Sequence, residues 1–305
     1  MIKNSQTIPL NLENQIYEDA VREIFRATKL PYNAWLRKII TPIVNKPVSR
    51  FAAMIADFDE TIKRHGFPAA SRKILLELTG SVVSDGVKNI PLTGPLILAS
   101  NHPGTYDGLA IISNLPRDDF RLIVSGVPFF QNLPNASQNL IFATHDVSDR
   151  MAVIRSCIRH LQEGGALLIF PSGRLDPDPS IFSNASDGLK RWSRSLEVFT
   201  SKVPEANLVL TIASGILSKK FINNPLLKLY KDDHEKRRLM EFIQIINQMV
   251  LGKPLNLSPK VSFSTPMKRF NNEKNLSGIQ QAVIQEKAAE LLACHIGLYY
   301  PLSTN

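Results

Sequence analysis

Short apolar runs separated by helical patterns constrain the fold of this chain most strongly. Residues 95–100 (PLILAS), 120–125, 166–170 and 208–213 each have the length and composition of a buried strand. Between the second and third runs, apolar residues recur at helical spacing at Met151, Ile154, Ile158 and Leu161. Strands that alternate with helices in this way are typical of a largely parallel sheet. We therefore predict an α/β fold with a mixed, largely parallel central sheet flanked by helices.

The two ends of the chain carry further helical patterns. Residues 189–199, 239–250 and 279–291 are expected to be helices, and residues 260–264 a late strand. Apolar residues also recur at helical spacing from Ile16 to about Leu78, where Pro31, Pro42 and Pro47 should divide the region into short helices. We predict a small N-terminal helical subdomain at residues 1–80 and an α/β domain at residues 81–305.

One N-terminal stretch combines apolar and basic residues. Arg37 and Lys38 interrupt an apolar helical pattern formed by Trp35, Leu36, Ile39, Ile40 and Ile43. A basic amphipathic helix of this kind suits a lipid interface. The alternative is an ordinary helix whose apolar face packs against the core.

Composition narrows the class of partner. The chain has 305 residues, 44% of them hydrophobic and 21% charged, which is typical of a folded globular protein. Its formal charge of +9 favours an anionic partner such as nucleic acid, anionic lipid, a phosphorylated substrate or an acidic carrier protein. The basic residues occur in twos and threes without a nucleic-acid-binding motif, so we expect no nucleic-acid partner.

Neither the cysteines nor the apolar stretches indicate an extracellular or membrane-spanning protein. Cys157 and Cys294 have no paired spacing, and no set of residues with metal-ligand spacing was identified. The N-terminal residues lack the apolar region of a signal peptide, and no run reaches the roughly 20 apolar residues of a spanning helix. We expect a cytoplasmic protein whose membrane contact, if any, is peripheral.

A block of seven residues follows the first predicted strand of the sheet: Asn101-His102-Pro103-Gly104-Thr105-Tyr106-Asp107. Pro103 disfavours the α conformation at His102 and suits the start of a helix, so His102 should lie at the carboxyl end of the strand. Open α/β sheets bind their ligands at this edge. Asp107, five residues on, can reach one imidazole nitrogen and leave the other free as a base. A base of this kind is what acyl transfer to an alcohol requires.

A second block accompanies the first, and together they resemble a known family. Residues 95–111 (PLILASNHPGTYDGLAI) resemble the first motif of the glycerol-3-phosphate and 1-acylglycerol-3-phosphate acyltransferases, the PlsC-like family. Residues 169–176 (IFPSGRLD) resemble its Phe-Pro-Glu-Gly-Thr-Arg motif. The resemblance implies an O-acyltransferase of phospholipid biosynthesis in which His102 is the general base and Asp107 orients it. It also implies substrate contacts by Asn101, Gly104, Pro171, Ser172, Gly173 and Arg174, the last loop holding the phosphate of the acceptor.

The implied substrates are glycerol 3-phosphate or lysophosphatidate as acceptor, and acyl-CoA or acyl carrier protein as donor. No metal or redox cofactor is implied. Backbone N–H groups near Gly104 or Gly173 are the expected donors to the oxyanion of the tetrahedral intermediate. Peripheral contact with an anionic membrane would follow from the lipid product and the positive charge.

The chain departs from the family pattern at two places. The usual Glu of the third motif is Ser172 here, and the Pro-Ser-Gly, Arg and Asp-Pro succession is similar to the soluble plastid-type glycerol-3-phosphate acyltransferases. The arginine of the second motif has no match near Ala143 and Thr144, so Arg150 or Arg155 would have to substitute. Lys190, Arg191 and Arg194 either supplement Arg174 or are solvated, and we expect solvation for at least two of them.

Two other functional classes remain open at this stage. A thioesterase or other hydrolase would use the same His/Asp pair with water as the acceptor. A non-catalytic lipid-binding protein would keep the fold without turnover. A nucleophilic role for Ser172 is disfavoured, because residues 170–173 lack the first glycine of the Gly-x-Ser-x-Gly elbow.

Overall fold

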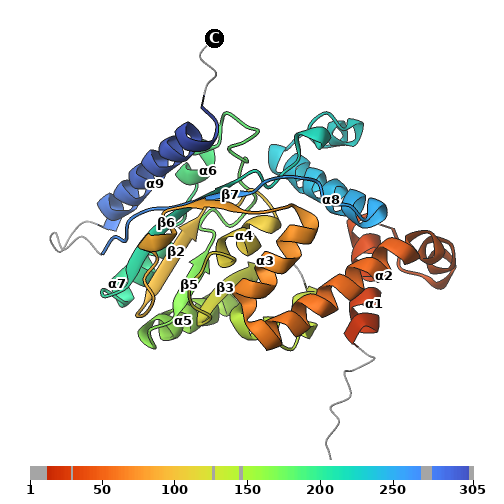
Figure 1. The fold of residues 1–305 in the computed structure, drawn as a ribbon, viewed down its shortest axis with the longest axis horizontal. Helices are drawn as coiled ribbons and strands as arrows, with labels where there is room; N and C mark the ends of the chain where they lie inside the picture. Colours follow the sequence, from red (N-terminus) through yellow and green to blue (C-terminus); the bar gives the residue numbers. More distant parts are fainter. Residues whose placement is uncertain (1–11, 29, 126–127, 144–146, 269–276, 302–305) are drawn as a thin grey trace, which may run out of the picture.

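A seven-stranded sheet forms the centre of the computed structural model, which describes residues 12–28, 30–125, 128–143, 147–268 and 277–301. The strands lie in the order β1-β7-β6-β2-β5-β3-β4. Figure 1 shows the four central strands β6, β2, β5 and β3 side by side. Every paired neighbour is parallel except β6 and β7. The predicted α/β class with a mixed, largely parallel sheet is therefore confirmed. The strands are β1 (Val83–Asp85), β2 (Leu96–Ser100), β3 (Phe120–Ser125), β4 (Leu140–Ala143), β5 (Ala166–Ile169), β6 (Asn207–Ser214) and β7 (Lys260–Phe263).

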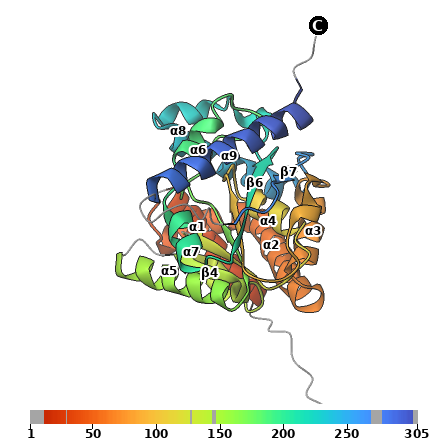
Figure 2. The same ribbon diagram turned by 90° about the vertical axis from the view of Figure 1, so that its left-hand side faces the viewer.

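Helices cover both faces of this sheet (Figure 2). Side chains alternate along a strand, so Leu96 and Leu98 of β2 join one apolar cluster while Ile97 and Ala99 join another. The first cluster includes residues of α1 (Leu12–Ala27), α2 (Ala34–His65), α3 (Phe67–Leu78), α4 (Tyr106–Ile112) and α8 (Asp233–Leu251). The second includes residues of α5 (Val147–Gln162), α6 (Ser186–Lys190), α7 (Ser195–Lys202) and α9 (Ser277–Tyr299). The central strands are thus buried on both sides.

Short 3-10 helices complete the described elements. Their bounds are η1 (Val87–Asn89), η2 (Pro128–Asn132), η3 (Ala136–Asn139), η4 (Lys219–Phe221) and η5 (Pro225–Leu229). In this described part of the chain, no helix has both the length and the apolar character needed to cross a bilayer.

The N-terminal helices differ from the expectation at two prolines. Pro42 and Pro47 lie inside the continuous 32-residue helix α2, so the prediction that they would divide it is wrong. Each proline costs roughly 3 kcal/mol in a helix interior. Packing offsets this cost, because Val48 is buried against Val21 and Phe25 of α1. Helix packing here outweighs local propensity.

The amphipathic stretch of α2 presents two apolar stripes. Leu36 and Ile40 pack against α1, as a core-facing helix requires. The side chains of Trp35, Ile39 and Ile43 are exposed instead, at 69%, 45% and 73%. One stripe therefore belongs to the core and the other faces solvent.

Two strands and one helix break were not predicted from the sequence. Both unpredicted strands, β1 and β4, lie at the edges of the sheet, and β4 pairs in parallel with β3 before the chain enters α5. The helix expected at 189–199 is two helices, α6 and α7, separated by a short turn. The domain boundary at residue 80 stays a prediction. The N-terminal segment 1–11 and Thr144 lie outside the described residues.

Candidate active site

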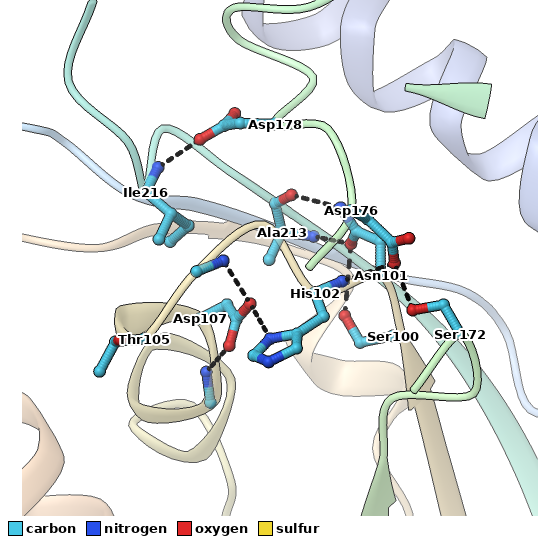
Figure 3. Close-up of polar contacts among 12 residues, drawn as sticks. Ser100, Asn101, His102, Thr105, Asp107, Ser172, Asp176, Asp178, Ala213 and Ile216 are labelled. Atoms are coloured by element: carbon cyan, nitrogen blue, oxygen red, sulfur yellow. Dashed lines mark hydrogen bonds and ion pairs between the residues drawn. The ribbon is translucent and has the colours of Figure 1, made fainter. Parts of the chain in front are cut away.

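Three loops meet at the carboxyl end of the central strands. β2 ends at Ser100, so Asn101 and His102 follow it directly, and α4 begins at Tyr106. β5 and β6 flank β2 on either side and run parallel to it. The loops that follow all three strands therefore leave the sheet at the same edge, where Figure 3 shows their polar side chains gathered. This is the edge at which open α/β sheets place their ligands.

His102 and Asp107 form a hydrogen-bonded pair at this edge. His102 Nδ1 lies 2.8 Å from Asp107 Oδ2, and the carboxylate also accepts from the Gly104 N–H at 3.0 Å and the Gly108 N–H at 2.5 Å (Figure 3). Asp107 is only 1% exposed, whereas the His102 side chain is 28% exposed. The carboxylate is an acceptor, so it holds the proton on Nδ1. Nε2 forms no hydrogen bond to any residue that the structure describes and is free to take a proton.

The imidazole is held from its face as well as its edge. The Phe170 ring, which follows β5, stacks on the His102 ring with centroids 4.3 Å apart and planes 20° apart. Stacking and the bond to Asp107 together restrict rotation of the ring. His102 is consequently oriented before any ligand arrives.

Carboxylates around His102 raise its proton affinity. Burial by itself lowers the pKa of His102, but Asp107, Glu241 and Asp176 more than compensate and raise that pKa to about 9. Three carboxylates thus stabilise the imidazolium. The positively charged form of His102 is therefore favoured at neutral pH.

Two side chains lock the loops together behind the pair. Asn101 is buried and bonds to both backbone groups of Ala213 in β6, accepting from N–H at 2.8 Å and donating to C=O at 2.9 Å. Asp176 is fully buried; its Oδ2 accepts from the His102 N–H at 3.0 Å, and its own N–H donates to the His102 C=O at 2.7 Å. Burial raises the pKa of Asp176. Hydrogen bonds from the His102 N–H and from Ser172 lower that pKa, as do the charges of His102 and Arg191.

A third buried carboxylate shapes the loop after β6. Asp178 accepts from three consecutive backbone N–H groups, those of Gly215 at 3.0 Å, Ile216 at 2.8 Å and Leu217 at 3.0 Å. Figure 3 shows the bond from Ile216. It also accepts from the N–H of Ser180 at 2.8 Å and from its hydroxyl at 2.7 Å. The loops after β5 and β6 are therefore joined through one anion.

The predicted phosphate loop lies beside the pair. Pro171 is buried, and its C=O accepts from Ser193 at 2.9 Å. Ser172 Oγ donates to Asp176 Oδ2, or to the Arg174 C=O, at 2.9 Å. Gly173 has φ +66°, a conformation that favours glycine, and Arg174 is exposed. The loop thus presents Arg174 outward from a turn that Asp176 anchors.

The two expected oxyanion donors have partners already. The Gly104 N–H donates to Asp107, and the Gly173 N–H donates to the Phe170 C=O at 3.0 Å. In this arrangement both N–H groups serve the loop conformation. Of the proposed replacements for the second-motif arginine, Arg150 and Arg155 are both exposed on α5.

Glu241 is a site residue that the sequence analysis missed. It lies on α8, and its carboxylate accepts from both the N–H and the hydroxyl of Thr105 at the start of α4. Burial raises the pKa of Glu241, whereas Thr105 and the charge of His102 lower it. A Cβ on Gly104 would lie 3.3 Å from Glu241 Oε1 and 3.1 Å from Ile216 Cγ2, so this tight approach favours glycine. Since Glu241 is 134 residues from Asp107 and belongs to no motif, only the fold identifies it.

Metal ligation has no visible basis in the described residues: no group of three or more His, Cys, Asp or Glu side chains is arranged to hold an ion.

The fold and the site define an α/β protein with a partly exposed His/Asp pair at the strand ends, the arrangement of a general acid–base site. The family model described as Acyltransferase matches residues 81–204, a segment that contains the pair and the whole loop after β5. Residues 81–204, which are less than half of the chain, are thus similar in sequence to the acyltransferase family.

Comparison with solved structures gives a similar chain. It is the crystal structure of the 1-acyl-sn-glycerophosphate (LPA) acyltransferase PlsC from Thermotoga maritima, which is 15% identical, with a TM-score of 0.40. The similarity covers 92% of this chain and 96% of that one. No curated protein has a sequence that matches this chain.

Proposed function

We propose that this protein transfers a fatty acyl group from a thioester to a hydroxyl of glycerol 3-phosphate or of its 1-acyl derivative, as a step of phospholipid synthesis. The observation that carries the proposal is the His102–Asp107 pair, 2.8 Å apart, inside the segment that matches the acyltransferase family. An alcohol is a weak nucleophile until a base removes its proton during attack. The open Nε2 of His102 is that base.

The proton and electron pairs balance around His102. Nε2 takes the proton of the acceptor hydroxyl while its oxygen attacks the thioester carbon, so a C–O bond forms and the carbonyl oxygen becomes an oxyanion. The oxyanion then collapses, the C–S bond breaks, and the thiolate takes the proton from Nε2. Asp107 stays ionised throughout and stabilises the imidazolium that exists between the two transfers.

The donor is proposed to be acyl-CoA or acyl carrier protein. Both are anionic, and the chain carries a formal charge of +9. Neither donor requires a metal or redox group for this transfer, so no cofactor is proposed.

Contact with a membrane is part of the proposal, because the acyl chains of substrate and product are apolar. The exposed stripe of Trp35, Ile39 and Ile43 on α2 lies beside the exposed Lys38, a combination that suits an anionic bilayer surface, whereas Arg37 pairs with Glu18 at 2.8 Å. The fraction of the protein that sediments with anionic liposomes should fall as the salt concentration rises. Binding that ignores both salt and anionic lipid would contradict electrostatic docking.

Radiolabelled acyl transfer tests the reaction. The full chain is incubated with labelled acyl-CoA or acyl carrier protein and with either glycerol 3-phosphate or its 1-acyl derivative, and the lipid product is counted. His102→Ala should reduce the rate by at least 100-fold, because general base catalysis contributes about 10²–10⁴. His65→Ala, which changes an exposed histidine at the end of α2, serves as the matched control. Full activity of His102→Ala would overturn the mechanism.

The same assay separates the other functional classes. Release of free fatty acid without an acceptor-dependent product would identify a hydrolase that uses the pair with water. Absence of both products, with acyl chains still bound, would identify a lipid-binding protein without turnover.

A further inference from the structure

Basic side chains from three separate segments converge beside the candidate active site. Arg174 follows β5, Arg191 ends α6, and His234 and Arg237 lie in the first two turns of α8. Burial lowers the pKa of Arg237, and the charge of Arg191 lowers it further. Burial also lowers the pKa of His234, and Arg237 and Arg174 add to the effect. Arg191 is therefore close enough to Arg237, and Arg237 and Arg174 are close enough to His234, for their charges to interact.

Arg237 is the least expected member of this basic cluster, which consists of Arg174, Arg191, His234 and Arg237. It is only 8% exposed, and its buried Nε has no hydrogen-bond partner. Asp176, Asp232 and Asp233 stabilise its charge at longer range, but none of the residues that the structure describes forms an ion pair with it. A buried guanidinium without a partner is strongly unfavourable unless a ligand supplies one.

Arg191 shows the same feature. Its Nη2 lies 3.2 Å from Asp176 Oδ1, but its buried Nε is unpartnered. Lys190 and Arg194, the neighbouring bases, are 73% and 71% exposed, so two of these three side chains are solvated as expected. Arg191 is the one that turns inward.

Asp176 links the basic cluster to the reaction centre. One of its oxygens accepts from Arg191, and the other accepts from the His102 N–H at 3.0 Å. Arg237 is connected to the same loop from α8, because it lies four residues, about one helical turn, before Glu241, whose carboxylate accepts from Thr105. Arginine suits an anionic oxygen cluster, because its planar fork donates two parallel hydrogen bonds.

We propose that Arg191 and Arg237 bind the phosphate group of the acceptor, with Arg174 at the rim. The inference rests on the proposed function for the identity of the acceptor. Neither Arg191 nor Arg237 belongs to the two motif blocks, and the two residues take over the role for which the chain lacks a second-motif arginine. The ligand class is a phosphomonoester attached to a short polyol.

Calorimetric titration of the full chain with glycerol 3-phosphate tests the site directly. Inorganic phosphate and glycerol are titrated in parallel, which separates recognition of the phosphate from recognition of the polyol. The test variants are Arg237→Met and Arg191→Met, which keep an apolar stem and remove the charge. Arg238→Met, which changes the exposed arginine next along α8, is the matched control.

Each charge-removing variant should weaken glycerol 3-phosphate binding by about 10- to 100-fold. Arg238→Met should change it by less than about threefold. Inorganic phosphate should compete, and glycerol should not bind. Wild-type affinity in both Arg237→Met and Arg191→Met, or no phosphate binding by the wild type, would overturn the proposal.

Stability distinguishes binding from a structural role. Removing an unpartnered buried charge should leave the melting temperature of Arg237→Met at or above that of the wild type. Phosphate should raise the melting temperature of the wild type but not of the variant. A variant that melts well below the wild type would assign Arg237 to the framework and overturn the proposal. Phosphate binding that depends on Arg237 without any acyl transfer would refute the proposed function and leave the anion site standing.

Discussion

The protonation of His102 leads to a quantitative prediction about pH. A general base must be neutral to act, yet the surrounding carboxylates raise the pKa of His102 to about 9. With that pKa, roughly 1% of the free protein carries neutral His102 at pH 7, and about half does at pH 9. We therefore expect kcat/KM to rise by about 50-fold between pH 7 and pH 9, with a slope near one below pH 8.

Glu241→Gln tests the electrostatic origin of this shift. Glutamine keeps an oxygen that can accept from Thr105 but removes one of the negative charges that raise the pKa of His102. The midpoint of the kcat/KM profile should therefore move to lower pH, and each unit of movement should raise activity at pH 7 by about tenfold. Glu286→Gln, an exposed change on α9, should leave the midpoint where it is.

Initial rates at low acceptor concentration between pH 5.5 and 10 provide the measurement, because kcat/KM reports the free protein. His102→Ala supplies the blank for base-catalysed hydrolysis of the thioester. A midpoint near 6.5 in the wild type would show that the carboxylates do not set the proton affinity of His102. An unchanged midpoint in Glu241→Gln would show that the charge of Glu241 does not raise the pKa of His102.

Two further predictions concern stability. Asp178→Asn replaces one of two oxygens that together accept from three backbone N–H groups, so it should destabilise the fold by about 3–5 kcal/mol. Urea unfolding should show a lower midpoint with unchanged slope, and a loss below about 1 kcal/mol would contradict this account. His295 is buried between Ser214 and Ser262, and burial, then Lys260, lowers its pKa to about 4. Because the unfolded chain protonates near pH 6.5, the wild type should lose about 3 kcal/mol as pH falls from 6.5 to 4. His295→Gln should lack this component, and equal acid sensitivity of both proteins would refute it.

The central strands were predictable because burial on both faces produces continuous apolar runs. β2, β3, β5 and β6 all show this pattern. β1 and β4 were not predicted, because these edge strands are short and half-exposed. Three or four residues show too little periodicity to identify a strand. The continuity of α2 through two prolines depended on packing against α1, which local sequence does not encode.

The residues of the candidate active site were likewise predictable only where they lie close together in the sequence. His102 and Asp107 are five residues apart, so the turn between a strand and a helix is enough to predict their pairing. Asp176 and Glu241 act on that pair from 69 and 134 residues beyond Asp107. Their roles depend on which loops the parallel sheet and α8 bring together, and sequence spacing carries no signal for that.

The edge strand β1 has a consequence for synthesis of the chain. Val83 pairs with Lys260 of β7, which is 177 residues later. At a translation rate of about 5–20 residues per second, β7 is synthesised roughly 9–35 s after β1. β7 also contributes Val261 and Phe263 to the apolar cluster beneath α2 and α3. The nascent chain must therefore expose that apolar surface until residue 260 leaves the ribosome, and it is a natural substrate for chaperones during this interval. His102 and Asp107 can pair early, but the carboxylate of Glu241 arrives only near the end, so the proton affinity of the site is set late in translation.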